Sequence, residues 1–156
     1  MSSTNTRDVT AEVTAFFERY ATSFNGALRR DQPASALTGL YTEHCLAAHP
    51  GGVDVGENDA KFVETLDQGF EHYRSIGTQG MVVRGVEVTP IDEFHAMARV
   101  SWRASYIRNS DRKPIDIDFD VTYLVQGLDP GDHDEWRVFA FITGDEQAEY
   151  AKHGLT

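Results

Sequence analysis

Hydrophobic residues recur every three or four positions near the start of the chain, which is typical of an amphipathic helix. Asp8 precedes this run and is a suitable N-cap, while Arg29 and Arg30 lie near its expected end, where cations complement the helix dipole. The pattern predicts a long first helix with one buried face, formed by Val9, Val13, Phe16, Phe17, Tyr20, Phe24 and Leu28.

Three shorter helices are expected after it. Pro33 can begin a short helix over residues 33–40, because its fixed φ suits the first helical position. Asn58 is the predicted cap of a further helix that ends at Gly77, and residues 145–153 form a last helix or tail. The buried side of the helix after Asn58 consists of Phe62, Leu66, Phe70 and Tyr73.

The remaining pattern predicts strands. Residues 45–49 and 53–55 flank the turn at Pro50-Gly51-Gly52 and form a short hairpin. Four longer strands follow, and the short turns between them imply an antiparallel meander. Their expected ranges are 79–89, 95–108, 115–127 and 135–143, with turns at 90–93, 109–113 and 128–132. The chain is therefore α+β, with helices gathered on one side of a curved sheet.

Two of the long strands alternate cleanly between apolar and polar residues. In a hairpin around Asp111, Arg103 lies opposite Asp118 and Ser101 opposite Asp120. These polar residues are either a solvated face with cross-strand ion pairs or the lining of a pocket. The strands over 79–89 and 135–143 carry apolar residues on both faces, so a homodimer through the sheet is expected to supply the missing cover.

Length and charge narrow the function. A chain of 156 residues is expected to form one domain, residues 8–156, after a flexible tail over residues 1–7. The net charge of −11 disfavours nucleic acids and anionic membranes as partners. There is no apolar run of the ~20 residues that span a bilayer. Cys45 is the single cysteine and no signal-peptide pattern precedes it, so a cytoplasmic location is expected.

Three stretches resemble the NTF2-like superfamily, in particular its SnoaL-like and ketosteroid-isomerase-like members. They are Phe16–Tyr20 in the first helix, Leu40–His49 with Pro50, and the final Trp136-Arg137-Val138. This resemblance in element order covers nearly the whole chain and implies a cone, in which a bent sheet wraps a long helix and encloses a pocket. By the same resemblance, His49 stands where the isomerases have a carboxylate base, and Asp120 where they have a protonated acid. The isomerases' helix-1 tyrosine has no match in register, since Tyr20 lies one turn earlier.

The chemistry of these residues leaves two alternatives for each. His49 is a candidate general base, because an ordinary imidazole titrates near neutral pH, or else a rim histidine that bonds the turn. Asp120 is a candidate hydrogen-bond donor if it is buried and protonated, or an ionised partner of Arg99 or Arg103. The candidate ligand-binding residues, which are core residues in the simpler interpretation, are Tyr20, Phe24, Trp102 and Tyr123.

No metal or cofactor is expected. His44 and His49 are five positions apart, so a strand directs them to opposite faces, and there is no phosphate loop, nucleophile elbow or dinucleotide fingerprint. Two hypotheses follow. The protein is a cofactor-free isomerase, cyclase, dehydratase or hydrolase of a small hydrophobic carbonyl compound, or a non-catalytic ligand-binding or dimerisation module.

Overall fold

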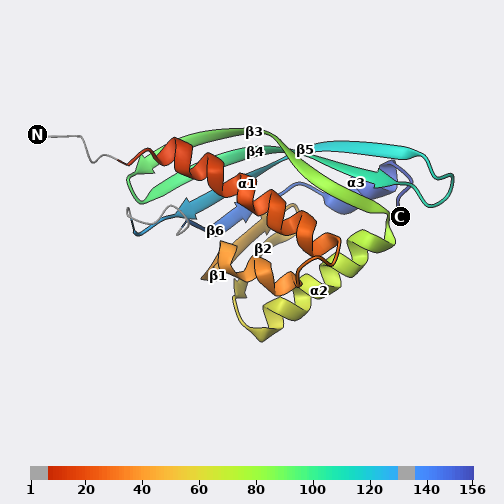
Figure 1. Cartoon of the computed structure of the whole chain (residues 1–156), viewed down its shortest axis with the longest axis horizontal. Helices are drawn as coiled ribbons and strands as arrows, with labels where there is room; N and C mark the ends of the chain where they lie inside the picture. Colours follow the sequence, from red (N-terminus) through yellow and green to blue (C-terminus); the bar gives the residue numbers. More distant parts are fainter. Residues whose placement is uncertain (1–6, 130–135) are drawn as a thin grey trace, which may run out of the picture.

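The computed structural model describes residues 7–129 and 136–156 (Figure 1). In chain order the described elements are α1 (Val9–Leu28), the 3₁₀ helix η2 (Ala34–Leu40), β1 (Tyr41–His49), β2 (Gly52–Glu57), α2 (Ala60–Ser75), β3 (Thr78–Asp92), β4 (His95–Ile107), β5 (Pro114–Gln126), β6 (Arg137–Ile142) and α3 (Glu146–Lys152). The predicted tail, apart from Arg7, and most of the predicted 128–132 turn lie outside the described residues.

The strands form one curved sheet in the order β2-β1-β6-β5-β4-β3, and α1 lies across its inner face (Figure 1). This arrangement confirms the predicted α+β cone around the first helix. One pairing differs from the expected antiparallel sheet, because β1 runs parallel to β6. The sheet is therefore mixed, and the parallel pair joins the short hairpin to the end of the meander.

Helix α1 begins and packs as its periodicity predicts. The Asp8 carboxylate accepts a hydrogen bond from the backbone N–H of Ala11 at 3.1 Å, which satisfies one of the free donors of the first turn. Its apolar side is buried against the inner face of the sheet, mainly on β3, in a core to which β4, β5 and β6 also contribute. The centre of this core is formed by Val13, Phe16, Phe17, Val100, Trp102 and Val138.

The sequence predicted Asn58 as the cap of α2, but the structure shows that the cap is Asp59. Asp59 Oδ1 accepts from the N–H of Phe62 at 3.1 Å. Asn58 instead donates through Nδ2 to the carbonyl oxygens of Thr38 and Tyr41, which ties η2 to β1. Both residue types are good caps, and only these tertiary contacts decide between neighbouring positions.

The predicted register of the β4–β5 hairpin is confirmed, with Arg103 opposite Asp118 and Ser101 opposite Asp120. The outer face there is a set of ion pairs. Arg103 Nε and Asp118 Oδ1 are 2.7 Å apart, and Arg84 of β3 adds a contact of 2.8 Å to the same carboxylate. This is the solvated polar face that the alternation allowed.

The two-sided apolar pattern of β3 has a local cause. A bulge between Val83 and Gly85 shifts the alternation, so Val83 pairs with Trp102 and Val86 with Val100. Both valines pack on the core, together with Met81 and Val88. A similar shift in the β5–β6 pairing, between Leu124 and Val125, interrupts the alternation of β6. The outer faces of β3 and β6 therefore need less cover from a second subunit than their sequences suggest.

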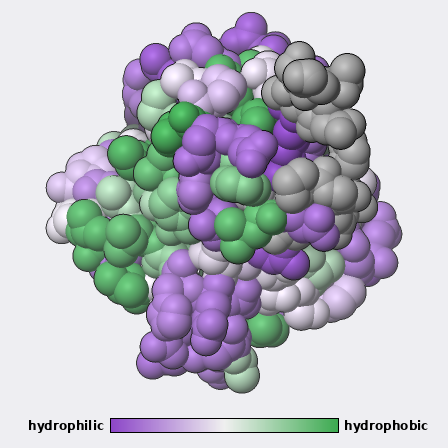
Figure 2. Space-filling model, turned by 90° about the vertical axis from the view of Figure 1, so that its left-hand side faces the viewer, coloured by the Kyte–Doolittle hydropathy of each residue, from purple (hydrophilic) through white to green (hydrophobic). Residues whose placement is uncertain are grey.

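Exposed apolar residues gather elsewhere, on the outer face of β1, β2 and β6. Leu46 pairs with Val55, and Ala48 pairs with both Val53 and Ile142, so the five side chains share one face. The exposed fractions are 45% for Leu46, 64% for Val53, 71% for Val55 and 57% for Ile142. Figure 2, which views the molecule from the end where α1 begins, shows hydrophobic residues gathered along one flank.

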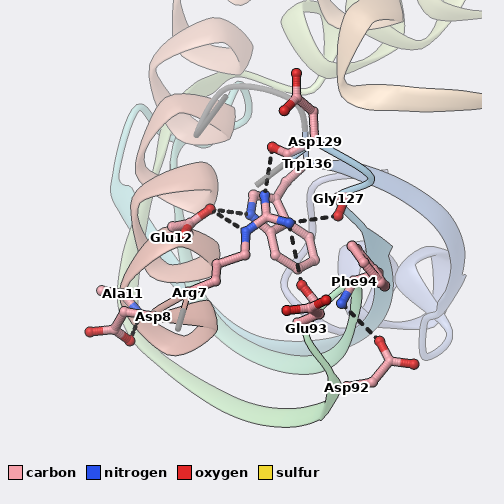
Figure 3. Close-up of polar contacts among 10 residues, drawn as sticks. All are labelled: Arg7, Asp8, Ala11, Glu12, Asp92, Glu93, Phe94, Gly127, Asp129 and Trp136. Carbon is pink, nitrogen blue, oxygen red and sulfur yellow. Dashed lines mark hydrogen bonds and ion pairs between the residues drawn. The ribbon is translucent and has the colours of Figure 1, made fainter. Parts of the chain in front are cut away.

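Arg7, assigned to the tail by the sequence, is buried instead (Figure 3). Its Nε lies 2.8 Å from Glu12 Oε1, and its guanidinium stacks over the Trp136 ring, 4.6 Å from the centroid. The indole N–H of Trp136 donates to the same Glu12 oxygen at 3.0 Å. The folded domain therefore includes Arg7, whose other hydrogen bonds go to the carbonyl oxygens of Glu93, Gly127 and Asp129.

Within the described part of the chain, none of the helices combines the length and apolarity that a bilayer crossing requires.

Candidate functional site

Two adjoining cavities of about 340 Å³ each lie inside the cone. The "tyrosine cavity" lies between α1, α2 and the inner face of β4, β5 and β6. The "α3 cavity" lies between β3, β4, β5, the far end of α1 and α3. Volumes of this size accommodate small-molecule ligands. The cavities adjoin because they share lining residues: Phe24, Tyr73, Met81, Phe119, Val121, Thr143 and Glu146.

All four predicted ligand-binding residues line the tyrosine cavity, and Phe24 lines the α3 cavity as well. Tyr20 and Phe24 project from α1, one turn apart, while Trp102 and Tyr123 come from β4 and β5. Their helical and strand periodicities direct them to the same interior. Whether they bind a ligand stays a prediction.

A polar cluster interrupts this apolar lining. Trp102 donates its indole N–H to the Tyr123 hydroxyl oxygen at 3.1 Å, and the hydroxyls of Tyr20 and Tyr41 share a hydrogen bond. Burial raises the pKa of Tyr20, Tyr41 and Tyr123, so all three hydroxyls stay protonated. The cluster therefore offers hydrogen-bond donors to the cavity.

Within the described part of the chain, the cluster keeps at least one unused donor. Its three hydroxyls carry three protons, and the Tyr20–Tyr41 bond uses one of them. An interaction between Tyr20 and Tyr123 can use a second. Because the indole of Trp102 can only donate, it takes none. One hydroxyl proton remains for an acceptor on a bound molecule.

Glu146, which the sequence did not single out, lies where the cavities meet. It is in the first turn of α3 and lines both cavities. The residue is exposed, yet the surrounding protein atoms partly desolvate its carboxyl and raise its pKa, while the charge of His72 partly opposes the shift. The sequence contained a weak signal for it, a carboxylate in the first turn of a helix that directly follows a strand.

His49 lies at the outer end of β1 and lines a separate "hairpin groove" of about 350 Å³, which Glu146 and Phe141 also line. Both ring nitrogens are engaged. Nδ1 accepts from the N–H of Gly51 at 3.1 Å, so Nε2 carries the proton and donates to Asp54 Oδ2 at 2.8 Å. This arrangement leaves no vacant nitrogen to accept a proton, and the predicted role of His49 as a base stays a prediction.

Asp120 borders the α3 cavity, but its carboxylate is bonded on the outer face of the sheet. Asp120 Oδ2 lies 2.8 Å from Arg99 Nη2, and hydrogen bonds from Ser101 and Arg99 lower the pKa of Asp120. Its side chain is 43% exposed. These contacts correspond to the ionised, arginine-paired alternative, because a protonated donor needs an apolar site without a cation. They bring Asp120 near neither His49 nor the tyrosines.

Cys45 lines a further cavity of about 250 Å³ between β1, β2 and α2. Burial raises the pKa of its thiol to about 11, so it carries little thiolate at neutral pH. No three His, Cys, Asp or Glu side chains of the described residues gather closely enough to hold a metal ion.

With this geometry established, comparison with known proteins identifies the family. Residues 11–146 match the model of a family described as NTF2-like protein (DUF6841). The chain belongs to this NTF2-like family. No curated protein matches the sequence.

Solved structures agree on the NTF2-like fold. An NTF2-like protein with a cystatin-like fold from Novosphingobium aromaticivorans is 18% identical, with a TM-score of 0.64 over 94% of this chain and 87% of that chain. A ketosteroid isomerase-like protein from Erwinia carotovora atroseptica is 17% identical, with a TM-score of 0.59 over 92% of this chain and 97% of that chain. A candidate scytalone dehydratase from the same Novosphingobium species is 17% identical, with a TM-score of 0.60 over 86% and 85% of the two chains.

At these identities the NTF2-like relatives establish the fold and not the reaction. The family assignment therefore supports the predicted cone and its interior pocket. The chemistry depends on residues of this chain itself, namely the tyrosine cluster and Glu146.

Proposed function

We propose that this NTF2-like protein binds a small, largely apolar carbonyl compound inside the cone and carries out cofactor-free acid–base chemistry on it. The observation that carries the proposal is the set of protonated hydroxyls of Tyr20, Tyr41 and Tyr123 in an otherwise apolar cavity. A carbonyl oxygen is the acceptor that such donors bind, and the apolar wall holds the rest of the molecule.

The charge of the site favours a neutral ligand. The chain carries a net charge of −11, and the carboxylate of Glu146 lies between the two cavities. An anionic ligand would be repelled by this carboxylate, and partial desolvation makes the repulsion stronger than in bulk water. The proposed ligand class is therefore neutral ketones, aldehydes and enones.

Gly69 permits a direct test of cavity binding. It is in α2, lines the tyrosine cavity, and an added Cβ would meet no atom within 4 Å. Gly69→Leu should extend a side chain from this open position into the cavity and remove a poor helix former, which is worth about 1 kcal/mol in a helix interior. Gln68→Leu is the matched control, because Gln68 is an exposed neighbour on the same helix and lines neither cavity.

The probes are cyclohexenone, 1-tetralone and a steroid enone, with binding followed by saturation-transfer NMR and titration calorimetry. We expect the wild type to bind at least one probe, Gly69→Leu to weaken that binding about tenfold or more, and Gln68→Leu to leave it unchanged. Failure of all three probes to bind the wild type would contradict the proposal. Binding that Gly69→Leu does not affect would place the ligand outside the tyrosine cavity.

The alternative, binding without catalysis, is favoured by one observation, the engagement of both ring nitrogens of His49. The two functions are separated by proton exchange. A catalyst speeds the exchange of ketone α-protons with D₂O, whereas a binding protein leaves it at the rate in buffer.

We also propose a homodimer through the outer face of the sheet, with the apolar residues of β1, β2 and β6 at its centre. Leu46, Val53, Val55 and Ile142 are all substantially exposed and share one face. Analytical ultracentrifugation should detect a dimer for the wild type and a monomer for Val55→Glu. Glu64→Lys, an exposed charge change on α2, should stay dimeric. A wild-type monomer would contradict this proposal.

A further inference from the structure

Five acidic residues border the α3 cavity, and the contacts of four of their carboxylates are accounted for. Asp118 pairs with Arg103 and Arg84, and Asp120 pairs with Arg99. Asp145 caps α3 by accepting from the N–H of Ala148 at 3.0 Å. Glu149 lies 3.7 Å from Nδ1 of His153.

Glu146 is the fifth, and among the described residues it has neither a hydrogen bond nor an ion pair. It lines the α3 cavity, the tyrosine cavity and the hairpin groove, so this residue lies where all three meet. Partial desolvation of a carboxylate that no described residue pairs with is unfavourable, and such groups concentrate at functional sites.

The surroundings of Glu146 are mostly tyrosines. Its charge adds to the effect of burial in raising the pKa of tyrosines from α1, α2, β4, β5 and α3. Two of them, Tyr20 and Tyr123, belong to the hydroxyl cluster, so the carboxylate and the cluster act on the same interior. The titratable groups around Glu146 are Tyr20, His72, Tyr73, Tyr106, Tyr123 and Tyr150, with His49, Asp145 and Glu149 at the edge of its cavities.

We infer that Glu146 is the general base of this site, which takes a proton from the carbon next to the carbonyl group of a ligand held by the tyrosine cluster. The inference rests on the proposed function and adds the substrate class, a neutral carbonyl compound with a removable α-proton. It also replaces His49 with a residue from the other end of the chain.

The proton-transfer step is balanced without a cofactor. The Glu146 carboxylate takes the α-proton, the C–H bond breaks, and its electron pair forms a carbon–carbon double bond as the carbonyl oxygen becomes an enolate oxygen. A tyrosine hydroxyl donates a hydrogen bond to that oxygen, whose charge is larger than in the ketone, and so stabilises the transition state. Transfer of that proton from Glu146 to another carbon gives isomerisation, whereas replacement of the carboxyl proton by solvent before its transfer to the same carbon gives α-proton exchange.

A raised pKa suits Glu146 to this role. Desolvation raises the pKa of Glu146 and so makes its carboxylate a stronger base than one in bulk water. The exchange rate should therefore rise with pH through the folded-state pKa of Glu146 and then level off.

The test measures the exchange of 1-tetralone α-protons in D₂O by NMR, alongside binding of the same ketone. Glu146→Gln keeps the shape of the side chain but cannot accept the proton, so we expect exchange to fall by about 10²-fold or more while binding is retained. Glu146→Asp should recover part of the rate and keep the pH dependence. Glu64→Gln is the matched control, because it makes the same change on the exposed side of α2 and should leave exchange unchanged.

Each contrary result has its own meaning. Exchange in Glu146→Gln within about threefold of the wild type would overturn the role of Glu146. Wild-type protein that binds the ketone but speeds no exchange would overturn proton transfer and leave the binding proposal standing. Wild-type protein that binds none of the three ketones would overturn the proposed function itself.

Discussion

The Arg7 guanidinium and the Glu12 carboxylate form a buried ion pair, 2.8 Å from Nε to Oε1, with side chains that are 1% and 6% exposed. Removing one partner of such a pair leaves an uncompensated buried charge. We therefore expect Glu12→Gln to lower the free energy of unfolding by about 3–5 kcal/mol, measured by urea denaturation.

The matched control is Arg29→Met, which breaks the pair with Asp31 between side chains that are 59% and 68% exposed. It should cost at most about 1 kcal/mol. The double variant Arg7→Met with Glu12→Gln should be more stable than Glu12→Gln alone. Equal effects of Glu12→Gln and Arg29→Met would contradict the assignment of Arg7 to the folded domain.

Glu146 should make stability fall as pH rises. Its pKa is raised in the folded protein, so the folded state binds more protons than the unfolded chain between the ordinary pKa and the raised one. The wild type therefore loses stability as Glu146 ionises. Glu146→Gln lacks this loss, and its melting temperature should exceed that of the wild type at pH 7. The excess should shrink toward pH 4 in thermal scans, and an excess that grows on acidification would refute the raised pKa.

His49→Gln should leave ketone exchange within about threefold of the wild type. Its Nδ1 accepts from Gly51 and its Nε2 is bonded to Asp54, so the ring has no vacant nitrogen for a substrate proton. The same NMR measurement checks this. A fall of about 10²-fold would restore His49 as the base that the sequence predicted.

Asp120→Asn should likewise preserve exchange, because the carboxylate is bonded to Arg99 on the outer face. Hydrogen bonds from Ser101 and Arg99 lower the pKa of Asp120. Asp120 therefore contributes stability above its ordinary pKa, and this contribution is lost as pH falls through the lowered value. The melting temperature of Asp120→Asn should fall less steeply on acidification than that of the wild type. A loss of exchange in this variant would support the sequence-based role of Asp120.

Much of the fold was predictable because its signals are local. The three- and four-residue spacing from Val9 to Leu28 predicted α1, and the alternation in β4 and β5 predicted their buried faces. A short turn around Asp111 then determines the register, which places Arg103 opposite Asp118. Where a bulge adds a residue, as between Val83 and Gly85, the alternation misleads because one shift reverses the faces.

The site was less predictable. Tyr20, Phe24, Trp102 and Tyr123 could be placed on inward faces from periodicity, and the structure brings them to one cavity. Tyr41 joins them only because β1 lies parallel to β6, a pairing between segments about 90 residues apart that no local pattern encodes.

The sequence by itself determined the elements and the inner face of the central strands, because each depends on periodicity over a few residues, and its resemblance to NTF2-like proteins implied the cone. Only the tertiary structure decided which polar groups meet inside the cone. It turned Asp120 outward to Arg99, engaged both nitrogens of His49, and left Glu146 beside the tyrosines with no hydrogen bond or ion pair to another described residue. The physical reason is that a group's solvation and partners depend on contacts between distant segments, which residue type and spacing do not contain.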